Sequence, residues 1–325
     1  MELTADADRE HALNAMWYSH SLCAAMWHSY SGTGYANPHA VTQIANGLST
    51  STFQFDNNGN VIQKLTDGVL TTYQWDYANR LIALGVNNAS TTYGYDAFGA
   101  RVLQTGTSTT TIYPVKWYSV ASSTGSGAAY ATTTEYVFNG DTLLATVDRQ
   151  LASGVATGTA KTRYIHPDHL GSTNVVTDEN GNVSQTLDFY PYGATRISSS
   201  VGGTDSARKF IGQFSDQSNL SYLNARYYDA ARGQFISQDP VFWSNRQNLS
   251  NPQSLNSYSY AEDNPITRKD PDGLAASNSA IVAIYQQLVN ILQSYISILS
   301  GSGGGSNGSQ SKCPSENILN PLNRL

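Results

Sequence analysis

The chain has 325 residues, of which only 13% are charged, about half the share that is usual in soluble domains. Its 24 acidic and 18 basic residues give a net charge of -6, which provides no electrostatic basis for binding nucleic acid. Two cysteines near opposite ends of the chain exclude a disulfide framework and lack the spacing of a zinc site. We therefore expect no nucleic-acid partner, no metal and no small-molecule cofactor.

Residues 1–36 form an N-terminal segment of unclear fold. The segment opens with acidic residues, as MELTADADRE, and has no unbroken apolar core, so no secretory signal peptide is visible. The stretch 8–27 is compatible with a short helix that places Leu13, Met16 and Trp17 on one side.

Residues 37–160 contain a repeat with a period of 20 residues. The stretches FQFDNNGNVI, YQWDYANRLI and YGYDAFGARV start at Phe53, Tyr73 and Tyr93, and in each an aromatic residue directly precedes an aspartate. The two aromatic residues of each unit alternate with a polar or small residue, which indicates a strand with one buried face. Each unit therefore predicts one β-hairpin. Because a lone hairpin is marginal in water, we expect the units to stack edge to edge into a continuous sheet.

The aspartates of the repeat are interpreted as turn formers, because an aspartate side chain can bond backbone amides two residues later. The positions of these aspartates, and of Asp178 in the similar stretch DENGNV, predict turns at 56–60, 76–79, 96–100 and 178–182. We assign no catalytic role to Asp56, Asp76 or Asp96. The Ser- and Thr-rich stretch 105–134 is expected to form longer strands joined by a flexible loop near SSTGSG.

The stretch HPDH at 166–169 has the H-x-x-H spacing of some metal sites. A strand would point His166 and His169 to opposite faces, and no third ligand is near in sequence. We interpret the stretch as a structural turn.

Residues 275–325 form a C-terminal tail with a different composition. The stretch 277–300 has no charged residue, and its polar positions recur every three or four residues, which predicts an amphipathic helix over 279–299. Its glutamines and asparagine argue against a membrane span. A flexible linker, GSGGGSNGS at 301–309, follows.

Four further motifs follow in a specific order: YIHPDHLGSTNVVTDENGNV (164–183), ARYYDAARGQFISQDP (225–240), NSYSYAEDNPI (256–266) and DPDGL (270–274). These motifs resemble the Rhs family of bacterial polymorphic toxins, and the 20-residue YxYDxxG units resemble the YD repeats of that family. The resemblance implies YD-repeat hairpins at 37–160 and an RHS repeat-associated core domain at 161–274. It implies a mainly β fold, with the hairpins forming a curved, partial shell-like sheet followed by one C-terminal helix.

In that family the shell encloses a toxic C-terminal segment, and the core domain cuts the chain just after a PxxxxDPxG motif. The motif corresponds here to Pro265, ITRK, Asp270, Pro271, Asp272 and Gly273. The resemblance thus implies cleavage between Leu274 and Ala275.

Paired carboxylates can hydrolyse an amide without a metal, Cys or Ser, because two close acids cannot both ionise. The protonated acid polarises the carbonyl, and the ionised one draws a proton from water. The expected catalytic pair is Asp239 and Asp270, each of which precedes a proline. Supporting candidates are Asp263, Asp272 and Arg232, and Arg226 is a second arginine able to orient a carboxylate. The competing interpretation is that Asp-Pro and DPDG are ordinary turn sequences.

The sequence therefore predicts the core of an Rhs-type polymorphic toxin, with aspartate-dependent, single-turnover self-cleavage after Leu274 as its only chemistry. The resemblance implies the chain's own tail as cargo, upstream Rhs repeats, a secretion apparatus and an immunity protein as partners. It also implies secretion or a cell-surface location in bacteria, and a role in interbacterial competition. Two alternatives stay open: a non-enzymatic adhesive YD-repeat protein of the cell surface, and an inactive truncated Rhs fragment.

Overall fold

The structure is a computed structural model. It describes residues 27–29, 39–123, 130–203, 205–241, 255–274, 276–278, 288–289 and 291–293. The chain divides into two compact units, Met1–Ala280 and Ile281–Leu325, and each is treated by itself. The predicted N-terminal helix lies outside the described residues except at its last position, Trp27, which begins a strand.

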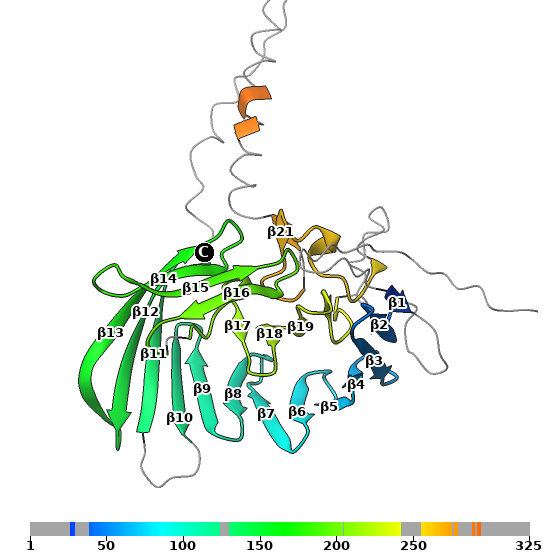
Figure 1. Cartoon of the computed structure of the whole chain (residues 1–325), viewed down its shortest axis with the longest axis horizontal. Coiled ribbons are helices and arrows are strands. Elements are labelled where there is room, and N and C mark those ends of the chain that lie inside the picture. Colours follow the sequence, from blue (N-terminus) through cyan, green and yellow to red (C-terminus); the bar gives the residue numbers. More distant parts are fainter. Residues whose placement is uncertain are drawn as a thin grey trace, which may run out of the picture. The chain divides into compact units, whose positions relative to one another are not determined.

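The first unit is built on one antiparallel sheet of 16 strands that pair in chain order, with β1 and β16 at its two edges. The strands are β1 (Trp27–Ser29), β2 (Gln43–Ala45), β3 (Thr50–Phe55), β4 (Val61–Thr66), β5 (Val69–Trp75), β6 (Leu81–Val86), β7 (Ala89–Tyr95), β8 (Arg101–Thr105), β9 (Thr109–Val115), β10 (Tyr118–Ser123), β11 (Tyr130–Asn139), β12 (Thr142–Ala152), β13 (Val155–Pro167), β14 (Thr173–Thr177), β15 (Val183–Phe189) and β16 (Thr195–Ser200). The sheet curves without closing into a barrel (Figure 1). The predicted fold of stacked hairpins in a curved, partial shell is confirmed.

The three repeat units form the hairpins β3–β4, β5–β6 and β7–β8, as predicted. In each hairpin the pairing register shifts at the aromatic residue before the aspartate: Phe55, Trp75 and Tyr95. This shift is a β-bulge, which increases local twist and bends the strand. The same bulge recurring every 20 residues gives the sheet a repeated bend.

The aspartate turns have one geometry throughout. In the first turn, Oδ1 of Asp56 accepts hydrogen bonds from the backbone N–H groups of Asn58 and Asn60. The same two bonds form at Asp76, Asp96 and Asp178. All four predicted turns are therefore present. Within the first turn only Gly59 has a positive φ, of 79°.

The stretch 105–134 contains the strands β9 and β10 and the start of β11, as expected. Its predicted flexible loop, 124–129, lies outside the described residues. The strands β11 to β13 are longer than those of the repeats, with 10, 11 and 13 residues. The predicted boundary between residues 160 and 161 falls inside β13.

A second, four-stranded antiparallel sheet lies within the curve of the large one (Figure 1). Its strands are β17 (Phe214–Ser215), β18 (Leu220–Leu223), β19 (Arg226–Asp229) and β20 (Gln234–Phe235). Every residue of β18, β19 and β20 is buried. Two 3-10 turns, η1 (Phe210–Gly212) and η3 (Ala261–Asp263), flank this sheet, and a short pair, β21 (Arg268–Lys269) and β22 (Ser277–Asn278), follows.

The aromatic side chains of the repeats join the two sheets. Phe53, Tyr73 and Tyr93 occupy the same repeat position, and each is at most 6% exposed. They form one apolar cluster with Tyr222 and Tyr227 of the small sheet. The period-two pattern therefore marks the concave, core-facing side of the shell.

Of the second unit, residues 288–289 and 291–293 are helical, which agrees with the predicted C-terminal helix. The rest of the predicted span 279–299 lies outside the described residues.

Candidate functional site

The structure brings Asp239 and Asp270 to one guanidinium group. Nη2 of Arg226 lies 3.2 Å from Oδ2 of Asp239 and 3.2 Å from Oδ2 of Asp270. The two carboxylate oxygens are therefore no further apart than twice that distance. Arg226 begins β19 and is 4% exposed, so this contact is made inside the protein.

Arg226 is fixed by further contacts. Its Nη1 donates to the carbonyl oxygen of Ser257 at 3.0 Å, and its Nε donates to the carbonyl oxygen of Gly273. Its guanidinium lies over the ring of Phe235, 3.6 Å from the centroid. Because a guanidinium is planar and offers several donors, these contacts hold it in one orientation.

The two aspartates are positioned by backbone bonds on different segments. The N–H of Asp239 donates to the carbonyl of Ser257 at 3.0 Å, and its Oδ1 accepts from the N–H of Val241 at 2.8 Å. That second bond closes a turn across the proline. Asp270 directly follows β21 and is 2% exposed, whereas the Asp239 side chain is 21% exposed. Of the pair, Asp239 is thus the more accessible to water.

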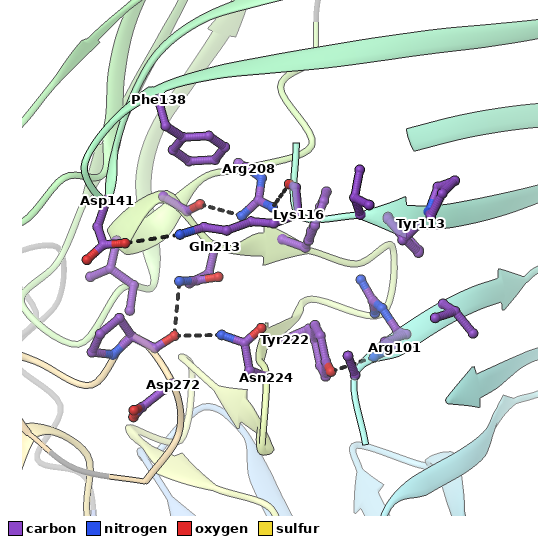
Figure 2. A pocket seen from close by; sticks show the side chains of 18 of the residues that line it. Arg101, Tyr113, Lys116, Phe138, Asp141, Arg208, Gln213, Tyr222, Asn224 and Asp272 are labelled. Atoms are coloured by element: carbon purple, nitrogen blue, oxygen red, sulfur yellow. Dashed lines mark hydrogen bonds and ion pairs between the residues drawn. The ribbon is translucent and has the colours of Figure 1, made fainter. Parts of the chain in front are cut away.

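The loop 270–274 is tied to the small sheet. The carbonyl oxygen of Pro271 accepts hydrogen bonds from Nε2 of Gln213 and Nδ2 of Asn224, both at 3.0 Å (Figure 2). Gly273 has a φ of 71°, and a Cβ placed on it would lie 2.6 Å from the carbonyl oxygen of Leu223. Only glycine fits this conformation and this close approach.

The peptide unit between Gly273 and Leu274 is held on both sides. Its carbonyl oxygen accepts from Arg226, and the N–H of Leu274 donates to Oδ1 of Asp270 and Oδ1 of Asp272, both at 3.1 Å. Leu274 therefore emerges directly beside the carboxylate cluster. Ala275, on the other side of the predicted cut, lies outside the described residues.

The electrostatics favour a shared proton. Burial raises the pKa of Asp270 to about 6; the Arg226 charge opposes this, and the carboxyl groups of Asp272 and Asp239 reinforce it. Burial also raises the pKa of Asp239, against the attraction of Arg226. The pKa of Arg226 is lowered by its own burial. Two or three carboxyl groups around one buried cation cannot all ionise freely, so one proton is readily retained.

The other predicted candidates lie in different surroundings. Asp272 joins the cluster through Leu274, but Asp263 is an exposed residue at the end of η3. Arg232 lies over the ring of Phe53, 4.5 Å from the centroid, and its Nε donates to Gln234. These contacts give Arg232 a packing role between the sheets.

The arginine at the centre of the cluster is Arg226, which the sequence suggested only as one of two arginines near YYD. Pro265 is buried on the segment that leads to β21. The catalytic roles of Asp239 and Asp270 stay a prediction.

The HPDH stretch is predicted as a turn, but His166 and Pro167 end β13, and only from Asp168 onward is there a turn, of the same kind as in the repeats. Oδ1 of Asp168 accepts from the N–H groups of Leu170 and Ser172. His166 contacts Thr177, and His169 contacts the carbonyl of Ile266. Within the described residues, no group of three or more His, Cys, Asp or Glu side chains is arranged to hold a metal ion.

The described chain is thus a curved sheet of stacked hairpins with a carboxylate cluster beside the loop 270–274. The Teneurin YD-shell family matches residues 155–266. A tRNA3(Ser)-specific nuclease WapA from Bacillus spizizenii is 29% identical over 75% of this chain and 11% of its own length. A double-stranded DNA deaminase toxin A from Burkholderia cenocepacia is 28% identical over 69% of this chain and 17% of its own.

Among solved structures, a crystal structure of TcdB2-TccC3 aligns with 77% of this chain and 14% of that chain, with a TM-score of 0.56 and 19% identity. That likeness shows the shell fold. Together the matches confirm the resemblance to the Rhs family: the chain carries a YD-shell segment of the kind found in Rhs-type toxins. It spans less than a fifth of the length of these relatives.

In the described part of the chain, no helix has the length and apolar character needed to cross a bilayer.

Proposed function

We propose that this chain is a single-turnover aspartyl autoprotease that cuts itself after Leu274. One observation carries the proposal: Asp239 and Asp270 contact the same nitrogen of Arg226, and Asp270 also accepts the N–H of Leu274. The reacting groups and the residue to be cut thus belong to one network. Because the substrate is part of the same chain, its effective concentration is high and one turnover is enough.

The two acids differ in a way that assigns their roles. Asp270 is the more buried and has a pKa near 6, so it is the acid that keeps a proton. Asp239 is the more accessible and acts as the base. Asp239 takes a proton from water as the water oxygen attacks the Leu274 carbonyl carbon, while Asp270 protonates the departing amide nitrogen. The carbon–nitrogen bond breaks, leaving a carboxylate on Leu274 and an amine on Ala275.

Arg226 would hold this arrangement together. Its donation to the Gly273 carbonyl fixes the peptide unit just before the reacting one. Its charge limits the rise in the pKa of Asp239 that burial causes, because a nearby cation favours the ionised carboxylate.

In this proposal the curved sheet is part of a shell that encloses the segment after Leu274, and cleavage frees that segment as an effector. Relatives named as a tRNA nuclease and a DNA deaminase toxin support an effector role for such segments. A toxin subunit, YenC1 from Yersinia entomophaga, is 31% identical over 35% of this chain. This match supports the proposal that the chain acts together with other subunits. Upstream repeats, a secretion apparatus, an immunity protein, export and interbacterial competition belong to the same proposal.

The proposal is tested by following cleavage of the purified full chain over time on denaturing gels. Asp239→Asn and Asp270→Asn are compared with Asp188→Asn, which removes a partly exposed carboxylate that pairs with Arg196. We expect both site variants to slow cleavage by at least about 100-fold, the usual scale for loss of acid–base catalysis. Asp188→Asn should cut at the wild-type rate. Equal rates for all four proteins would remove the carboxylates from the mechanism.

A second candidate is a non-enzymatic surface or adhesive protein. It is favoured by a match to a salivary gland surface protein 1 of Aedes aegypti, 32% identical over 36% of this chain. A wild-type chain that stays intact under all conditions would support this candidate.

A further inference from the structure

A cavity of about 490 Å³ lies beside the loop 270–274. Its walls come from the large sheet at Tyr113 and Lys116, from the η1 region at Arg208 and Gln213, and from the loop at Asp272 (Figure 2). The volume is within the range of sites for small molecules, roughly 300–1,000 Å³. The proposed cleavage does not use this cavity.

Two cations on its wall, Arg208 and Lys269, make no direct contact with a carboxylate among the described residues. Neither Arg208 nor Lys269 forms an ion pair with a carboxylate among the described residues that line the cavity. Arg208 is only 5% exposed. Its Nη1 and Nη2 donate to the carbonyl oxygens of Gly212 and Lys116, both at 3.1 Å, and it lies 3.8 Å from the centroid of Phe214. Carbonyl groups and a ring face neutralise a guanidinium only in part.

The carboxylates that do line the cavity are engaged elsewhere. Asp96 accepts two backbone N–H groups of its own turn, and Asp272 accepts the N–H of Leu274. Asp141 pairs with Lys116 at 3.0 Å, but both side chains are more than half exposed, so this pair contributes little.

Burial is costly for both cations, and for Lys269 the attraction of Asp141 and Asp168 offsets this cost only in part. The pKa of Arg208 is lowered to about 10, with burial as the largest cause. Burial also lowers the pKa of Lys269, whose Nζ donates to the carbonyl of Leu170 at 3.0 Å. An anion close to these groups would reverse both effects, because an opposite charge favours the ionised form.

Part of the remaining wall of the cavity is apolar. Its apolar residues include Val115 and Phe138 of the large sheet, Ile211 of η1 and Phe214 of β17. A ligand that matches both parts carries one anionic end and an apolar body. We propose that this cavity binds a small organic carboxylate, with the carboxylate facing Arg208 and Lys269 and the apolar body against Phe138 and Phe214.

The site also touches the loop of the proposed cleavage. Lys269 directly precedes Asp270, and Pro271 lines the cavity while its carbonyl is held by Gln213 and Asn224. Binding itself does not depend on cleavage, so the two proposals can fail separately.

The test is isothermal titration calorimetry on the full chain at fixed ionic strength. The probes are 4-methylpentanoate, its uncharged amide and inorganic phosphate. Lys269→Met and Arg208→Lys are compared with Lys209→Met, which removes an equal charge that pairs with Asp205 and does not line the cavity. A thermal unfolding curve for each variant checks that it is folded, and if Arg208→Lys does not fold, Lys269→Met alone decides.

We expect saturable binding of 4-methylpentanoate and none of its amide. Lys269→Met should weaken binding roughly tenfold or more, the scale of one lost hydrogen bond to a charged group, and Lys209→Met should not change it. No saturable binding, equal binding of the amide, or equal weakening by Lys209→Met would overturn the proposal. Binding of phosphate in preference to the carboxylate would overturn the assigned ligand class.

Discussion

Replacing Gly273 with alanine tests whether the loop 270–274 packs as closely against the small sheet as the structure shows. Two costs add at this position. A positive φ of 71° costs an alanine roughly 1–2 kcal/mol. The new Cβ would also lie 2.6 Å from the carbonyl oxygen of Leu223 and 3.0 Å from the backbone nitrogen of Arg226, so the loop must move, at a cost of about 1–3 kcal/mol.

We therefore expect Gly273→Ala to lower the free energy of unfolding by about 2–5 kcal/mol in urea titrations, or to detach the loop and abolish cleavage. The matched control is Gly99→Ala, because Gly99 also has a positive φ, of 88°, but a Cβ there would have no atom within 4 Å. Only the conformational cost applies to the control. If both variants lose the same stability and both cleave at the wild-type rate, the tight packing of the loop is refuted.

Three further predictions concern the charges of the core and the turns. Asp216→Asn breaks the buried ion pair with Arg101, at 2.7 Å, and should lower the free energy of unfolding by about 3–5 kcal/mol in denaturant titrations. Asp141→Asn breaks the exposed pair with Lys116 and should lower it by less than about 1 kcal/mol. Similar losses for the two variants would contradict the argument that burial sets the cost. Because the pKa of Asp270 is raised, the folded state binds more protons than the unfolded state, so stability should fall as pH rises from about 4 to 6, by an amount on the order of 3 kcal/mol. Asp270→Asn should flatten this pH profile, and an unchanged profile would show that another group titrates. Asp96→Ala removes two hydrogen bonds of 2.9 Å in the turn and should lower the free energy of unfolding by about 1–2 kcal/mol, measured by thermal unfolding. Asp96→Asn keeps an acceptor oxygen and should lower it clearly less. Equal losses for the two variants would count against the turn-forming role of Asp96.

The repeat made most of the large sheet predictable. Phe53, Tyr73 and Tyr93 recur every 20 residues with an aspartate three positions later, and that pattern fixes both the buried face and the turn. The bulge before each aspartate was not predicted, because a register shift depends on pairing between strands and leaves no mark in period-two alternation. The small sheet was also missed as an element, since β17 and β20 have two residues each.

The candidate site could be predicted only in part. The Asp-Pro motifs and the family resemblance pointed to Asp239 and Asp270, which the structure places on one guanidinium. Sequence reasoning could not choose Arg226 over Arg232, because the two differ in what packs around them: Arg226 faces the carboxylates, and Arg232 lies over the rings of Phe53 and Phe55. Such a difference arises from contacts between segments far apart in the chain.

The central claim, hydrolysis after Leu274 by the carboxylate pair, is tested most directly by intact-mass spectrometry of the chain incubated in water enriched in oxygen-18. The account predicts two fragments, 1–274 and 275–325, with one heavy oxygen in the new carboxyl group of Leu274 and none in the second fragment. It also predicts an intact mass for Asp270→Asn over the same period. A wild-type chain that remains intact, a cut at another bond, or equal cleavage of Asp270→Asn would contradict it.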